Sequence, residues 1–265
     1  MELKNIFKME MYKNWSNRPY LIVIAILTVM AAAATFLGVA MVEEVFTEKT
    51  STLLIFLIPL IVFFVLGLVT FSILFPFHLL NTDYKNRVIS LIFASGVSRE
   101  KYYFVKISAT ILTYFTTWFV IWLIPIVTFS FFYDPFDAEN PIQTVIKFFA
   151  ATFQPLAFMQ YWEANVFLTV LSVFLSILSN ILILTTSVII TKGKVAGIFL
   201  YFGFLFTLST IQSMISLPLL LVGAGLGTFN SDSYTNMMNW GIVSSIVQIV
   251  GFALLGLWVL RKQDL

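Results

Sequence analysis

The chain has no cysteine and a single histidine, His78. Without cysteine it can form neither a disulfide nor a thiolate metal site, and it has no thiol nucleophile. One histidine cannot supply the two ligands of an HExxH zinc motif. The sequence also lacks a GxSxG nucleophile turn and a GxxxxGK[ST] phosphate loop. We therefore expect no catalytic residue, no metal site and no ATP hydrolysis by this chain itself.

Charged residues are also scarce: they make up 11% of the 265 residues, whereas hydrophobic residues make up 60%. A soluble fold cannot bury so much apolar surface, and apolar runs of about eighteen or more residues are typical of membrane helices. Six such runs predict an all-α integral membrane protein with a single transmembrane domain, residues 1–265. The predicted spans are about residues 20–42, 52–77, 109–132, 165–190, 195–221 and 240–260.

Lysine and arginine are distributed asymmetrically about these spans. Thirteen of the fifteen lie in the N-terminal segment, the second and fourth loops and the C-terminal segment, which share one side of the membrane. Since positively charged loops remain in the cytoplasm, we expect both termini to be cytoplasmic. The net charge of +2 then reflects topology and attraction to anionic headgroups, and it predicts no nucleic-acid partner.

The predicted spans contain no Asp, Glu, Lys or Arg. Proton relays and ion-coupled carriers depend on ionisable groups at membrane depth. Their absence counts against an ion-coupled carrier, so the energy for any transport would have to come from elsewhere.

The N-terminal segment, residues 3–17, has a moderate helical pattern. Leu3, Ile6 and Phe7 share one face, although Glu10 interrupts the apolar stripe. Such a helix would lie along the inner leaflet before Pro19 turns the chain into the membrane. The alternative is a plain basic flank that only sets the topology.

The largest predicted cytoplasmic loop, residues 79–106, contains a second amphipathic pattern. We expect its charged start, residues 83–87, to be exposed. Gly96 predicts a helix end, and Ser98 predicts the N-cap of the next helix. A short amphipathic helix of this kind suits a groove on a partner protein, whereas the alternative is a solvated hairpin that only joins two spans. The apolar face of the predicted helix comprises Tyr84, Val88, Leu91 and Ile92.

The run from Asp83 to Arg99, DYKNRVISLIFASGVSR, resembles the cytoplasmic loop of ABC-2-type transporter permeases. In that family an acidic residue and a short helix precede a Leu-Leu-x-Ser-x-Pro-x-Ser-Arg-like turn, and a basic helix then enters the third span. Here Gly96 stands where the family often has proline, and Asn86-Arg87-Val88 stands where a Gly-Thr pair is common. The segment of residues 3–17 is similar to the family's elbow helix, and the six-span layout covers the whole chain.

The resemblance implies the membrane-spanning permease subunit of an ATP-driven exporter in the bacterial cytoplasmic membrane. It implies pairing with a second permease subunit, identical or related, and with a separate ATP-binding cassette ATPase. ATP and Mg²⁺ would be bound by that ATPase, so this chain would hold no cofactor. Residues about 84–94 would form the coupling helix that contacts the ATPase. The implied contact residues are Tyr84, Arg87, Val88, Leu91, Ile92, Ser95 and Arg99.

Polar residues within the predicted spans leave two interpretations open. Asn180, Gln212 and Gln248 fall near mid-membrane on different spans, where they either hydrogen-bond across helices or line a translocation path. The small polar residues of the fourth span, among them Ser172, Ser179 and Thr186, favour close helix packing over a path.

The outer loop, residues 133–164, predicts one more amphipathic helix, lying in the outer headgroup region. It would act as an outer gate or as a helix that caps the bundle. The uncharged, aromatic-rich spans favour a lipophilic or amphipathic cargo, with antimicrobial or other amphipathic peptides first and lipids or drugs next. The alternative function is that of a non-transporting membrane protein, such as an immunity factor or the membrane partner of a sensor.

Overall fold

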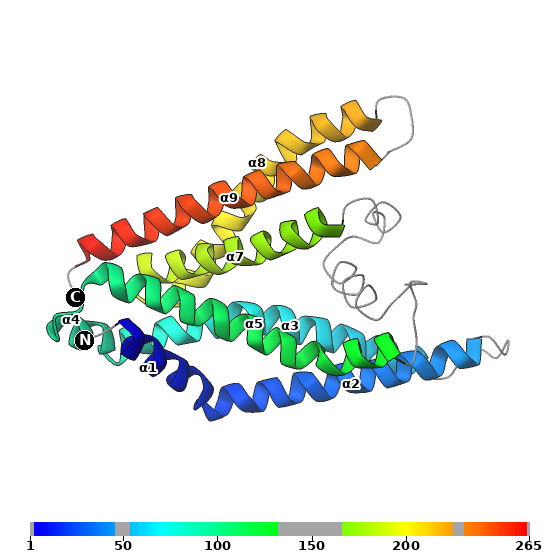
Figure 1. Ribbon diagram of the computed structural model, residues 1–265, viewed down its shortest axis with the longest axis horizontal. Helices are drawn as coiled ribbons and strands as arrows, with labels where there is room; N and C mark the ends of the chain where they lie inside the picture. Colours follow the sequence, from blue (N-terminus) through cyan, green and yellow to red (C-terminus); the bar gives the residue numbers. More distant parts are fainter. Residues whose placement is uncertain (1–2, 46–53, 132–165, 225–230, 264–265) are drawn as a thin grey trace. The chain divides into compact units, whose positions relative to one another are not determined.

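The computed structural model describes residues 3–45, 54–131, 166–224 and 231–263. Within these ranges all regular secondary structure is helical (Figure 1). The predicted outer loop, residues 133–164, lies outside the described residues. In chain order the described helices are α1 (Leu3–Trp15), α2 (Arg18–Val45), α3 (Leu54–Lys85), α4 (Val88–Ala94), α5 (Arg99–Phe131), α7 (Val166–Ile190), α8 (Ala196–Ala224) and α9 (Ser231–Lys262).

Five segments of the described helices are long and apolar enough to cross a membrane. They are Arg18–Leu37, Val62–Lys85, Arg99–Thr128, Val170–Ile190 and Met238–Lys262. Helix α8 coincides with the fifth predicted span, residues 195–221, and its described apolar segment is the shorter Ala196–Gln212. The all-helical membrane fold is therefore confirmed over the described residues, and a membrane crossing by α8 stays a prediction.

Helices α3 and α5 extend further than the spans expected from hydropathy. Helix α3 continues to Lys85 instead of ending near residue 77, and α5 begins at Arg99 instead of near residue 109. Apolar runs mark only the part of a helix that is in lipid, whereas the backbone hydrogen bonding continues into the polar residues beyond it. Much of the expected loop, residues 79–106, is thus formed by helix ends, with the short α4 between them.

The chain divides into two compact units, to which α3 and α5 both contribute. The N-terminal unit comprises Glu2–Phe75 and Ser108–Val145, and the C-terminal unit comprises Pro76–Ile107 and Ile146–Leu265. In the N-terminal unit, the Tyr20 ring stacks on Phe75 with ring centroids 4.4 Å apart. The Tyr20 hydroxyl also makes a short hydrogen bond to Thr117 of α5.

The buried face of α1 differs from the expected one. Ile6, Glu10 and Asn14 are buried, and their spacing of four residues places them on one side of the helix. Asn14 Nδ2 donates a hydrogen bond of 3.0 Å to Thr113 Oγ1 of α5. Glu10 was expected to interrupt the apolar stripe, but it belongs to the buried face. Polar packing onto α5, which an apolar pattern does not reveal, therefore positions this helix.

In the C-terminal unit, α7 and α9 lie side by side (Figure 1). Ser179 Oγ donates a hydrogen bond of 2.6 Å to Gln248 Oε1, and Thr186 Oγ1 donates one of 2.9 Å to the Phe252 carbonyl. The two bonds join residues 69 and 66 positions apart, so contacts advance together along both helices and the pair runs parallel. Ser179 and Thr186 are one heptad apart on the same face. They serve helix packing, as predicted.

Candidate functional site

Helix α4 is set apart from α3 by a sharp backbone turn. Arg87, its N-cap residue, has a φ of 53°, in the left-handed region, and the Arg87 N–H donates to the Tyr84 carbonyl at 3.2 Å. After the helix, Gly96 has a φ of 85°, so the predicted glycine stop is confirmed. The predicted cap of the next helix is also present: the Lys101 N–H is 3.4 Å from Ser98 Oγ.

This turn divides the apolar face predicted for Tyr84, Val88, Leu91 and Ile92. Tyr84 belongs to the last turn of α3, whereas the other three lie on α4. The prediction of one continuous helical face was therefore wrong, because the left-handed backbone at Arg87 stops the helical register between them. An arginine gives no sequence signal for such a conformation, which glycine or asparagine adopts far more often.

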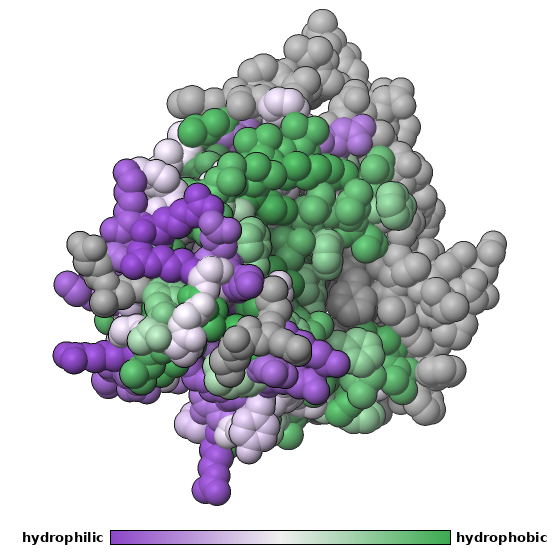
Figure 2. Space-filling model, turned by 60° about the vertical axis from the view of Figure 1, so that its left-hand side comes forward, coloured by the Kyte–Doolittle hydropathy of each residue, from purple (hydrophilic) through white to green (hydrophobic). Residues whose placement is uncertain are grey.

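Helix α4 has one anchored and one open side. Ile89 is 2% exposed and faces the other helices of the C-terminal unit, whereas Leu91 is 68% exposed. Of the other predicted contact residues on this segment, Arg87 and Ser95 are exposed, and Val88 and Ile92 are half-buried. Figure 2 shows both strongly hydrophilic and strongly hydrophobic residues on the face that it brings forward. Ile89, the anchor, was not among the predicted site residues.

A buried ion pair closes the base of the α4 hairpin. Lys106 Nζ of α5 lies 2.5 Å from Asp83 Oδ2 of α3, and both side chains are almost fully buried. The Tyr102 hydroxyl donates a hydrogen bond of 2.9 Å to the same carboxylate oxygen. Asp83 was expected to be exposed, and this was wrong, because the longer α3 and α5 bring it opposite Lys106. Buried opposite charges are tolerated when each is paired and hydrogen-bonded.

Arg99, the first residue of α5, binds the C-terminal end of α9. Its Nη1 donates to the carbonyls of Leu260, Arg261 and Gln263 at 3.0, 2.6 and 2.8 Å. The last carbonyls of a helix lack intrahelical partners and carry a partial negative charge, so a guanidinium is well suited to them. The resemblance implies partner contact for Arg99, and in the structure its Nη1 binds carbonyls of the same chain.

Gln263 joins three helix ends. Its Nε2 donates to the Ile189 carbonyl of α7 at 2.5 Å, and its Oε1 accepts a hydrogen bond of 3.0 Å from the Tyr84 hydroxyl of α3. The side chain is buried although it follows the last residue of α9. Tyr84, like Arg99, is thus engaged inside the chain. No sequence pattern singled out Gln263, because a lone amide beyond a helix end has no characteristic spacing.

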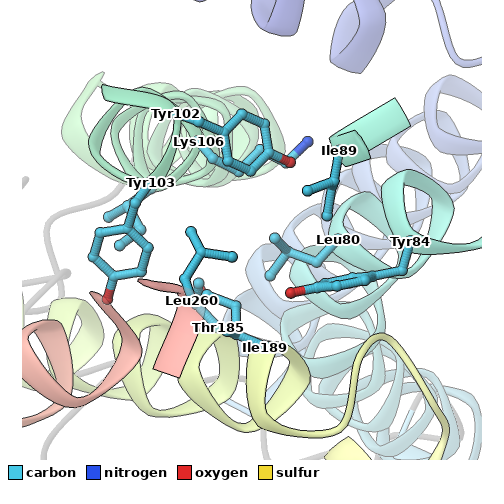
Figure 3. A pocket seen from close by; sticks show the side chains of 10 residues that line it. Leu80, Tyr84, Ile89, Tyr102, Tyr103, Lys106, Thr185, Ile189 and Leu260 are labelled. Atoms are coloured by element: carbon cyan, nitrogen blue, oxygen red, sulfur yellow. The ribbon is translucent and has the colours of Figure 1, made fainter. Parts of the chain in front are cut away.

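The helix ends enclose a small cavity beneath α4 (Figure 3). Its volume is about 10 Å³, room for roughly one water molecule. Ile89 enters it from α4, Leu260 from α9 and Ile189 from α7 (Figure 3). The space is too small for a ligand of drug size, which needs a cavity of several hundred Å³. The small cavity indicates that the ends of α3, α4, α5, α7 and α9 are closely packed against one another.

The three amides expected at mid-membrane have different surroundings. Gln248 accepts from Ser179 and donates to Ser244 Oγ at 3.2 Å, so its described hydrogen bonds go to serines. Asn180 is half-buried on α7, and Gln212 is exposed on α8. Gln248 therefore belongs to the packed seam between α7 and α9. A translocation path through Asn180 and Gln212 stays a prediction.

Five long apolar helices, together with a polar joint where helix ends meet, define the class: a helical multi-pass membrane protein. Among the described residues, no group of three or more His, Cys, Asp or Glu side chains could hold a metal ion. No protein-family model, curated protein or solved structure matches the chain.

Proposed function

We propose that this chain is the permease subunit of an ATP-binding cassette exporter in the bacterial cytoplasmic membrane. A separate ATPase would bind ATP and Mg²⁺, and a second permease subunit would complete the membrane domain. The proposed cargo is lipophilic or amphipathic, with antimicrobial or other amphipathic peptides first and lipids or drugs next. The predicted spans are uncharged and rich in aromatic residues, which favours such a cargo over a sugar or an ion.

The observation that carries this proposal is the geometry of α4. Its inner side is anchored by Ile89, while Leu91 extends outward with 68% of its surface exposed. An apolar side chain held outward on a rigid, short helix is suited to a groove on a partner protein. The sequence resemblance of this same segment to the permease loop supports an ATPase as that partner.

The test is co-purification of the tagged protein from its native membranes, with Leu91→Asp as the variant. A carboxylate at this position would have to be desolvated in the partner's groove, so we expect the ATPase to be lost from the complex. Val195→Asp is the matched control, because Val195 is similarly exposed in the connection between α7 and α8. Mass spectrometry of the wild-type sample should reveal a stoichiometric protein with a GxxxxGK[ST] loop.

Two results would contradict the proposal. Recovery of the chain alone, in detergents that preserve membrane complexes, would favour the non-transporting alternative. Equal recovery of the ATPase with Leu91→Asp and with wild type would remove α4 as its docking site.

A further inference from the structure

Both flanks of α4 are attached to one short segment at the end of α9. On the N-terminal flank, the Tyr84 hydroxyl donates to Gln263 Oε1. On the C-terminal flank, Arg99 donates to the carbonyls of Leu260, Arg261 and Gln263. Helix α4 lies between these two attachments in the chain, so it cannot lift away from the C-terminal unit while both hold.

The same segment is attached to α7. The Gln263 amide donates to the Ile189 carbonyl, and Gln263 is only 7% exposed. The Gln263 side chain therefore uses both of its polar atoms, one toward α3 and the other toward α7. A buried amide that satisfies two partners on different helices fixes their positions more tightly than apolar packing does.

The space beneath α4 gives little freedom for independent motion. Ile89, Ile189 and Leu260 line the same cavity of about 10 Å³ (Figure 3). A displacement of Ile89 larger than this gap must push on side chains of α7 and α9, because packed interiors transmit strain.

We propose that Arg99 and Gln263 form a latch that makes α4 and the C-terminal ends of α7 and α9 move as one body. The use of the latch rests on the proposed function: motion of an ATPase docked on α4 would pass through it into α7 and α9. Arg99 and Gln263 act in this proposal as positioning residues, through the helix ends that they join.

The latch can be tested on the purified full chain in lipid nanodiscs without any partner protein. The chain has no cysteine, so Ile89→Cys introduces one thiol whose labelling by a water-soluble maleimide reports how often α4 lifts. In this background, Gln263→Met keeps the side-chain volume and removes both amide hydrogen bonds. We expect the labelling rate to rise roughly fivefold or more, because the loss of one or two hydrogen bonds shifts the opening equilibrium of α4 by about this factor.

Lys262→Met is the matched control, because it makes the same replacement at the exposed neighbouring residue and should leave the rate unchanged. Tyr84→Phe removes only the hydroxyl bond to Gln263, so a smaller rise is expected there. A second reporter, Ile6→Cys in the buried face of α1, detects general loosening of the protein.

Equal labelling of Ile89→Cys with Gln263→Met and with Lys262→Met would overturn the latch. A rise of the same size at Ile6→Cys would also overturn it, because the substitution would then act on the whole fold. Failure of the latch and failure of the permease proposal are distinguishable. Faster labelling of Ile89→Cys combined with recovery of the chain alone would support the latch and reject the ATPase partner. Unchanged labelling combined with co-purification of the ATPase would reject the latch and support the ATPase partner.

Discussion

Asp83 of α3 and Lys106 of α5 form a buried ion pair at the base of the hairpin that presents α4. The pair joins two helices that the sequence separates by α4 and its turns. The pair therefore determines how the hairpin that presents α4 is closed.

Asp83→Asn should destabilise the protein by about 3–5 kcal/mol, because it leaves the Lys106 ammonium buried without its counter-charge. The measurement is the free energy of unfolding in detergent, obtained from a denaturant titration. The double variant Asp83→Leu with Lys106→Met should recover much of this loss, since no buried charge remains. A double variant as unstable as the sum of the single variants would contradict this explanation.

Ile89→Ala should cost about 2–5 kcal/mol, because it removes buried methyl groups and enlarges the cavity beneath α4. Leu91→Ala, on the opposite side of the same helix, should change stability by less than about 0.5 kcal/mol. Thermal unfolding of both variants in one detergent checks the contrast. Comparable losses for the two would mean that Leu91 is also packed in the folded chain.

Gly256→Ala should destabilise the joint between α5, α7 and α9. A Cβ at Gly256 would lie 2.5 Å from the Tyr103 hydroxyl and 2.9 Å from Thr186 Oγ1, so the neighbours would have to shift at a cost of about 1–3 kcal/mol. Gly251→Ala is the control, because no heavy atom from outside its own stretch of helix lies within 4 Å of its new Cβ. Denaturant midpoints should fall for the first variant and stay level or rise for the second.

Two adjacent residues at the start of α5 should differ in importance. Arg99→Met removes charged hydrogen bonds to three carbonyls at the end of α9, and we expect a loss of about 1.5–3 kcal/mol. Glu100→Gln removes an ion pair with Arg261 in which both side chains are more than half exposed, so it should cost less than about 1 kcal/mol. Raising the ionic strength should reduce the small Glu100 effect further. Equal losses at both positions would contradict the assignment of Arg99 as the helix cap.

The sequence predicts those features of this fold that depend on local pattern. Apolar runs locate the membrane helices, Gly96 ends α4, and Ser98 caps α5, because each of these signals acts within a few residues. The contacts that complete the site join residues far apart: Asp83 with Lys106, and Gln263 with Tyr84 and Ile189. Their burial depends on how far each helix continues beyond its apolar run, which hydropathy does not specify.

The register of α4 could not be predicted for a similar reason. Helical spacing places Tyr84 on one face with Val88 and Leu91, and only the left-handed backbone of Arg87 separates them. Glu10 illustrates the opposite error: its charge suggests exposure, yet a polar surface on α5 lets the α1 face that carries it be buried. At Glu10 tertiary packing outweighs the local preference of the residue, and at Arg87 the backbone conformation itself departs from that preference.

The position of Gln263 also sets the order in which the molecule can be assembled during synthesis. The hairpin of α3, α4 and α5 leaves the ribosome long before residue 263, so the Asp83–Lys106 pair can form while the carbonyl and amide partners of Arg99 and Tyr84 do not yet exist. Early in biogenesis the Asp83–Lys106 pair therefore closes the hairpin, while α4 still lacks both attachments to the end of α9. The attachment of α4 to Gln263 can form only after α9 has been inserted. A nascent chain that ends before Gln263 would leave the polar groups of Tyr84 and Arg99 without these partners, and quality-control proteases could recognise them.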